Sequence, residues 1–152
     1  MLVDRYARED VFAQVPKLAQ EIDPVLRKLD GLLEDDNLYQ QVRTDFGQRA
    51  RATLVHGRHS TPVEVLLRLL ILKHLYQWSY KETEGRVADS LVLRWFCRLG
   101  MQPAPPANSV SRGAGQVSVA TLEALANRVK QAKERAKASE GRLRPTYRER
   151  WR

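Results

Sequence analysis

The chain has 152 residues, of which 43% are hydrophobic and 29% are charged, and its formal net charge is +8. This length accommodates one globular domain with a buried core, and the hydrophobic fraction excludes a wholly disordered chain. Charged residues interrupt every apolar stretch, and even the most hydrophobic one contains Arg68 and Lys73. These interruptions exclude a membrane span.

Two short helices are predicted in the N-terminal third. In the segment EIDPVLRKLDGLLEDD, Asp23 can cap a helix and Pro24 can take its first position, where the missing N–H costs nothing. One apolar stripe follows at Val25, Leu26, Leu29, Leu32 and Leu33. After the acidic turn at Asp35 and Asp36, a second helix is predicted. Its inward positions are Leu38, Val42 and Phe46.

The centre of the chain carries the clearest helix signals. The segment TPVE, from Thr61 to Glu64, has the pattern of a capping box with proline at the first helical position. The helix that follows, to about Gln77, is apolar on almost every side and is therefore expected to be surrounded. A second capping box, Ser79 to Glu82, opens a helix to about residue 88.

A third central helix, LVLRWFCRL, starts after Asp89 or Ser90. Three short helices joined by tight polar turns allow a helix-turn-helix arrangement, but an ordinary helical bundle without a ligand has the same spacing. Both interpretations stay open at this point.

A proline-rich segment, MQPAPPANS, breaks the chain before its last helix. Gly113 and Gly115 weaken any helix directly after this break. Ser118 can cap a long helix with a charged outer face, which is either simply solvated or in contact with phosphate. The inward positions of this helix are Leu122, Leu125, Ala126, Val129, Ala132 and Ala136.

These patterns predict an all-α fold: a bundle of short helices with a helix-turn-helix-like centre, a long basic C-terminal helix and a disordered tail. The predicted divisions are an N-terminal helical segment at 1–55, a helical core at 56–103, a linker with the basic helix at 104–140, and a tail at 141–152. The acidic N-terminus does not resemble a signal peptide, and the single cysteine allows no internal disulfide, so we expect a cytoplasmic protein.

The basic charge is concentrated toward the C-terminus. Residues 1–55 carry eight basic and ten acidic side chains, a net charge of −2. The balance is +3 over residues 56–100, with seven basic and four acidic side chains, and +7 over residues 101–152, with eleven and four. Positive charge gathered at one end favours a nucleic-acid partner, although basic tails also occur without any ligand.

The sequence contains no recognisable catalytic or metal-binding pattern. The segment RGAGQ lacks both the spacing of a phosphate-binding loop and a preceding strand. His56 and His59, with His74 and one cysteine elsewhere, lack a convincing fourth zinc ligand. Cys97 lies among aromatic and aliphatic residues, where a buried thiol is the expectation. We therefore expect no metal and no catalytic residue in this chain.

The segment GRHSTPVEVLLRLLILKHLYQWSYKETEGRVADSLVLRWFCRLGMQP, residues 57–103, resembles the N-terminal region of bacterial insertion-sequence transposases of the DDE type, insertion-sequence-five-like group. The shared features are a Leu-rich helix after Thr-Pro, the aromatic turn and helix YQWSYKETE, the helix DSLVLRWFCRL and a proline turn. The similarity extends to residues 23–46 and 121–144. The segment PPANSVSRGAGQVS departs from the family, which has a polar-acidic cap and an aromatic-bearing helix there.

The resemblance implies that the long basic helix leads into a ribonuclease-H-like catalytic domain. Three acidic residues of that domain would hold two magnesium ions for DNA strand transfer. At the equivalent place this chain has GRLRPTYRERWR, with no aspartate. No catalytic residue carries over, and no cofactor is expected here, magnesium belonging to the missing domain. The ending is expected to be truncated or out of frame, with a natural basic tail as the alternative.

The predicted function is therefore that of a DNA-binding N-terminal portion of a transposase, lacking the catalytic acids and inactive alone. The alternative is a helical self-association or regulatory protein that restrains intact transposase. Expected partners are double-stranded DNA at the terminal inverted repeats, a second copy of the chain, or intact transposase. The candidate DNA-contact residues are Arg58, Lys81, Arg86, Arg94, Arg98, Arg112, Lys130 and Lys133.

Overall fold

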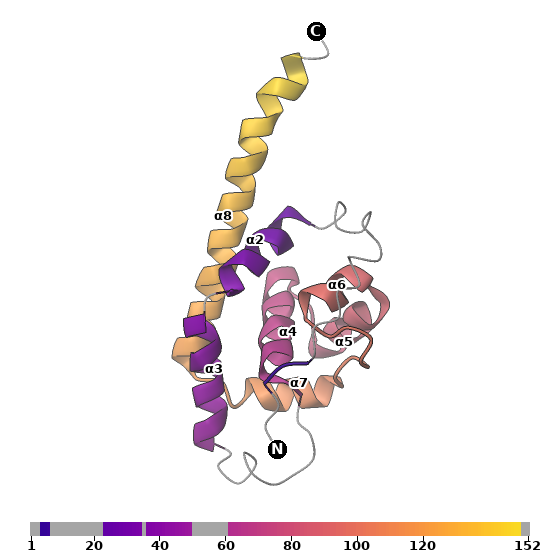
Figure 1. The fold of residues 1–152 in the computed structure, drawn as a ribbon, viewed down its shortest axis with the longest axis vertical. Helices are drawn as coiled ribbons and strands as arrows, with labels where there is room; N and C mark the ends of the chain where they lie inside the picture. The colour runs from indigo at the N-terminus through magenta and orange to yellow at the C-terminus, as the bar shows by residue number, and fades with distance from the viewer. Residues whose placement is uncertain (1–3, 7–22, 35, 50–60, 150–152) are drawn as a thin grey trace.

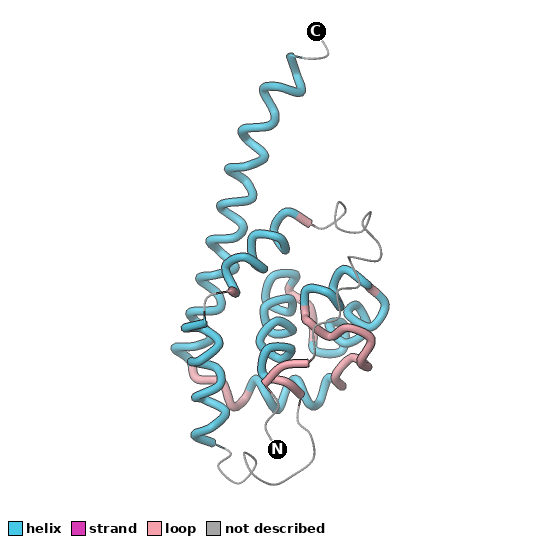
Figure 2. Tube along the Cα trace, viewed as in Figure 1, coloured by secondary structure: helices cyan, strands magenta, loops and turns pink. Residues whose placement is uncertain are grey.

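The computed structural model describes residues 4–6, 23–34, 36–49 and 61–149, with the backbone alone at 48–49 and 140–149. Within these ranges the chain forms seven helices and no strand, as Figures 1 and 2 show. The predicted all-α class is confirmed. The helices are α2 (Pro24–Leu33), α3 (Asp36–Arg49), α4 (Val63–Tyr76), α5 (Tyr80–Asp89), α6 (Leu91–Phe96), α7 (Ala107–Ala114) and α8 (Val119–Glu149).

Helix α4 is the centre of the molecule (Figure 1). It packs against α3, α5, α7 and α8, and its residues from Val63 to Leu72 are all buried. A helix that is apolar on every side is stable only when other elements remove that surface from water. The prediction of a surrounded central helix is therefore confirmed.

Helix α8 is held to the body along one face. The buried residues of this face recur at intervals of three or four, which places them on one side of a helix. They are Thr121, Leu125, Val129, Ala132 and Ala136. Helix α2 packs across this face, and α3 and α4 cover the rest. The C-terminal part of α8 projects beyond the other helices in Figure 1.

The tail differs from the sequence-based expectation. Residues 141–152 were expected to be disordered, but α8 continues as a helix through Glu149, and residues 150–152 lie outside the described part of the chain. Extending an existing helix avoids a new nucleation step, and the Arg, Leu and Glu residues of this stretch have high helix propensity.

Several predicted caps are present. Asp23 Oδ1 accepts a hydrogen bond from the Val25 N–H at 2.8 Å and begins α2. Ser79 and Glu82 form a complete capping box at the start of α5. Of the two residues predicted to begin the next helix, Ser90 does so, because its hydroxyl accepts from the Leu93 N–H at 3.2 Å.

The capping box predicted at Thr61 to Glu64 is wrong. Pro62 is the N-cap of α4 and makes no side-chain cap bond. The Glu64 N–H instead donates to the carbonyl of Asp4 at 3.4 Å, and the Glu64 carboxylate lies 3.7 Å from Arg68 Nε and 3.5 Å from Arg5 Nε. Two guanidinium groups attract this carboxylate more strongly than a local backbone N–H does.

Two helix ends are completed by side chains from other helices. Glu84 of α5 accepts from the Ala107 N–H at 2.9 Å, which caps α7 where Pro106 has no side-chain donor or acceptor. Asp45 of α3 accepts from the Ser118 N–H at 3.0 Å and from the Thr121 hydroxyl at 2.7 Å, where α8 begins. These contacts fix the positions of α7 and α8 as well as their ends.

Helix α7 forms despite the glycines that weaken it. A Cβ added to Gly113 would lie 2.5 Å from Leu66 Cδ2, so the absence of a side chain is what lets α7 approach α4. Gly115 lies at the C-cap, outside the helix proper. The packing of α7 against α4 therefore compensates for the low helix propensity of this segment.

A buried charge joins three helices. Arg68, in the middle of α4, is 2% exposed and donates to Asp30 of α2 at 2.7 Å and to the carbonyl of Phe96 at 2.9 Å. Arg98 donates to the same Asp30 oxygen at 2.8 Å. Burial, and then the nearby charge of Arg98, lower the pKa of Arg68, whereas the hydrogen bond and charge of Asp30 raise it.

Replacing Asp30 with Ala should lower the free energy of unfolding by about 3–5 kcal/mol, because two guanidinium groups lose their shared carboxylate. Urea unfolding followed by circular dichroism measures this loss. Asp36→Ala is the control, since Asp36 is exposed and lies 3.8 Å from Arg5, so its loss should be below about 1 kcal/mol. Equal losses in the two variants would contradict the central role of Asp30.

Replacing Gly113 and Gly85 with alanine should change the stability of the protein in opposite directions. A Cβ at Gly85 meets nothing within 4 Å, so Gly85→Ala should raise stability by about 0.5–1 kcal/mol. Gly113→Ala should lower it, because overpacking against Leu66 costs about 1–3 kcal/mol and exceeds the helix-propensity gain. Thermal unfolding of both variants would show the two midpoints moving in opposite directions, and a rise in both would refute the close α4–α7 contact.

Candidate nucleic-acid interface

Seven of the eight predicted DNA-contact residues lie in the described part of the chain, and Arg58 lies outside it. They do not form one patch, since they are distributed over α5, α6, α7, α8 and the turn after α6. Their surroundings divide them into residues that hold the fold together and residues whose charge is available at the surface.

Arg94 and Arg98 are engaged within the protein. Arg94 donates to the carbonyls of Ala88 at 3.0 Å and Gln102 at 2.8 Å, and so ties α6 to the segments on either side of it. Arg98 pairs with Asp30 and lies 5.2 Å from the centre of the Trp95 ring. The sequence shows their charge but not these partners, of which Asp30 is 68 residues from Arg98. Their role in DNA contact stays a prediction.

Lys130 and Lys133 are exposed on α8, as expected. Lys137 is also exposed and, at a spacing of seven from Lys130, lies on the same side of the helix. None of these three ammonium groups has a hydrogen-bond or ion-pair partner among the side chains that the structure describes. We call Lys130, Lys133 and Lys137 the α8 lysine stripe. The helical period alone places Lys137 on this side, although it is not among the DNA-contact residues predicted from the sequence.

Lys81 and Arg112 are exposed on separate helices. Lys81 lies in the first turn of α5. Arg112 lies in the last turn of α7 and donates to the Asn108 carbonyl of its own helix at 3.4 Å. Neither is committed to a contact with another helix in the described part of the chain.

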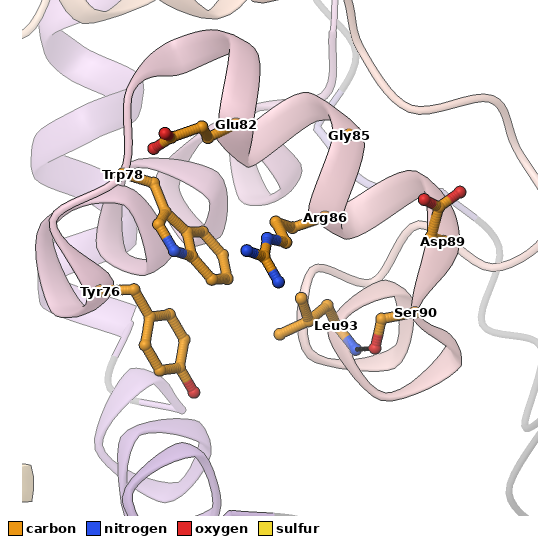
Figure 3. A pocket seen from close by; sticks show the side chains of 8 residues that line it. All are labelled: Tyr76, Trp78, Glu82, Gly85, Arg86, Asp89, Ser90 and Leu93. Atoms are coloured by element: carbon orange, nitrogen blue, oxygen red, sulfur yellow. Dashed lines mark hydrogen bonds between the residues drawn. The ribbon is translucent and has the colours of Figure 1, made fainter.

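Arg86 lies in a groove of about 670 Å³ between α5, α6 and the turn after α4 (Figure 3). Its guanidinium is 5.7 Å from the centre of the Trp78 ring, and Trp78 stacks with Tyr76 at a centroid distance of 4.5 Å. The remaining lining residues are Glu82, Gly85, Asp89, Ser90 and Leu93. We call this feature the Arg86 groove.

Tyr76 is fixed at the edge of this groove. Its hydroxyl donates to Asp23 Oδ2 at 3.3 Å. Burial, and then the charge of Asp23, raise the pKa of Tyr76 to about 12, so the phenol stays protonated over the physiological range. The ring therefore presents a neutral, oriented aromatic surface, and no acid or base chemistry is expected from it.

Potential metal ligands are dispersed in the described part of the chain. No group of three or more His, Cys, Asp or Glu side chains in this part of the chain could hold a metal ion. Cys97 is buried, and burial raises its pKa to about 12, which disfavours the nucleophilic thiolate. His56 and His59 lie outside the described residues. None of the described helices is long and apolar enough to cross a membrane.

Comparison with known proteins identifies the family. No curated protein and no solved structure matches this chain. The model of the family described as Transposase domain (DUF772) matches residues 13–112, a span that includes α2 to α6 and most of α7. This match covers about two thirds of the 152 residues, so the chain belongs to the transposase domain family DUF772.

Proposed function

We propose that this chain is the DNA-binding portion of a DDE-type transposase of the insertion-sequence-five-like group. Membership of a transposase domain family supports a role in transposition. The net charge of +8 supports a polyanionic partner, and no described cluster suits the metal-assisted chemistry of strand transfer. DNA binding without catalysis is the function that these properties favour.

The observation that carries the proposal is the α8 lysine stripe. Lys130, Lys133 and Lys137 project from one side of a helix whose opposite side is buried in the protein. They make no competing ion pair among the described side chains, so they can neutralise phosphates without losing an internal contact. Lys130 and Lys137 are seven residues apart, so the stripe extends about 10 Å along α8 at 1.5 Å per residue.

Such lysines position a protein on DNA without reading its sequence. Arg112 and Lys81, which are exposed on other helices, would add phosphate contacts from the body. Recognition of terminal inverted repeats would require base contacts from the helices of the body, and one candidate for such a contact is developed below.

A protein partner is the second candidate function. Val119 and Leu122 at the start of α8 are 72% and 42% exposed. They line a second groove, of about 750 Å³, together with residues of α4, α5 and α7. Exposed apolar side chains beside a groove favour association with another protein surface. Self-association, or binding to intact transposase, would use this surface and leave the α8 lysine stripe free.

Replacing Lys130 and Lys133 with Gln should reduce the slope of log affinity against log salt concentration by about one to two, since each lysine releases about one counterion on binding phosphate. Fluorescence anisotropy with terminal-repeat duplex DNA at several salt concentrations measures the slope. Arg135→Gln is the control, because this exposed residue lies on a different side of α8. An unchanged slope in the double variant would remove the α8 lysine stripe from the interface.

The purified chain should bind duplex DNA without cutting it. Incubation with supercoiled plasmid and magnesium should leave the plasmid intact, because the described residues hold no carboxylate cluster for metal ions. Plasmid nicking that persists in repeated preparations and is abolished by EDTA would contradict the proposal. A preparation that binds DNA tightly serves as the control for correct folding.

A further inference from the structure

The Arg86 groove differs chemically from the rest of the basic surface. One wall is made of flat or apolar side chains, namely the stacked pair Tyr76 and Trp78 and the side chain of Leu93. Its polar groups are the Arg86 guanidinium and the carboxylates of Glu82 and Asp89. The groove combines an aromatic face, a hydrogen-bond donor and acidic acceptors, and its volume lies within the roughly 300–1,000 Å³ of ligand pockets.

The polar groups of the groove differ in whether they already make hydrogen bonds within the protein. Glu82 accepts from the Ser79 N–H at 3.0 Å, and Ser90 accepts from the Leu93 N–H, so both have structural roles. Arg86 and Asp89 are exposed and make no hydrogen bond or ion pair with the described residues. The Trp78 ring nevertheless orients the Arg86 guanidinium, which lies over it. In Figure 3 the Arg86 guanidinium lies between Trp78 and Leu93, whereas the Asp89 carboxylate lies at the far end of α5.

Gly85 makes room on the α5 side of the groove. It occupies the interior of a ten-residue helix, where glycine costs about 0.5–1 kcal/mol relative to alanine. Nothing in the chain lies within 4 Å of the position of its missing Cβ. Gly31 and Gly47 share this property, but of the three only Gly85 lines the Arg86 groove. A ligand in the groove could approach the α5 backbone closely at this point.

We propose that the Arg86 groove binds one unpaired nucleobase of the DNA partner. Two carboxylates beside one guanidinium disfavour a phosphate, whereas a base is neutral, flat and carries both donors and acceptors. Guanine fits best, because its O6 and N7 suit the Arg86 fork. Trp78 holds the Arg86 guanidinium in place, and Leu93 adds an apolar surface beside it. This inference rests on the proposed DNA-binding function.

The test compares three duplexes of one sequence: fully paired, with a single bulged guanine, and with an abasic site in place of that guanine. The wild-type chain should bind the bulged-guanine duplex at least about fivefold more tightly than the abasic one, the lower end of what one bidentate arginine–guanine pair provides. Binding of the bulged duplex should also quench tryptophan fluorescence, whereas the fully paired duplex should quench it less.

Arg86→Gln and Trp78→Leu should abolish this preference, so that each variant binds the bulged-guanine and abasic duplexes equally. Trp78→Phe should retain part of the preference, because a ring remains at the wall. Lys81→Gln is the matched control on the same helix, since Lys81 lies outside the groove. It should weaken binding to all three duplexes equally and keep the preference. Arg86 is exposed, so Arg86→Gln should fold normally.

The outcomes separate this inference from the proposed function. If the wild-type chain binds all three duplexes equally with a clear salt dependence, DNA binding stands and the nucleobase site is wrong. A preference that survives both Arg86→Gln and Trp78→Leu places the base elsewhere and also overturns the inference. If the chain binds none of the duplexes, the proposed function and the nucleobase site fail together.

Discussion

The fold depends on the placement of one positive charge inside an otherwise apolar helix. Arg68 lies in the middle of α4, and a buried guanidinium without a carboxylate would cost several kcal/mol. Asp30 of α2 meets this requirement at 2.7 Å, and the Phe96 carbonyl at the end of α6 accepts a second hydrogen bond at 2.9 Å. Hydrophobic contacts are non-directional and tolerate sliding between helices. The hydrogen bonds of this network are directional and do not tolerate it, so they set the relative positions of α2, α4 and α6.

The same dependence on distant partners applies to the helix ends. Six of the seven described helices have fourteen residues or fewer, a length that is marginal for an isolated helix in water. Glu84 completes α7 and Asp45 completes α8, while the Asp4 carbonyl accepts the Glu64 N–H of α4. Each of these contacts joins segments at least 23 residues apart in the chain. Local helix formation and tertiary packing are therefore coupled in this protein.

This coupling explains how the basic residues divide between structure and surface. Arg68, Arg94 and Arg98 connect helices: Arg68 and Arg98 pair with Asp30, and Arg94 donates to backbone carbonyls. The α8 lysine stripe lies on the face of α8 that the body leaves uncovered. Arg86 differs from both groups, because it lies at the surface but is oriented by an aromatic ring. In the proposed function, the exposed lysines contact phosphates and the oriented Arg86 contacts a base.

The sequence by itself determined the helical class, the central buried helix and the caps at Asp23, Ser79 and Ser90, because these depend on residues at most four positions apart. It also located the exposed lysines of α8 through the helical period. Only the tertiary structure decided that Glu64 pairs with arginines, that Gly113 allows α7 to approach α4, and that Arg98 is internal while Arg86 is not. The physical reason is that charge pairing and close packing depend on spatial neighbours far apart in the chain, which local spacing does not encode.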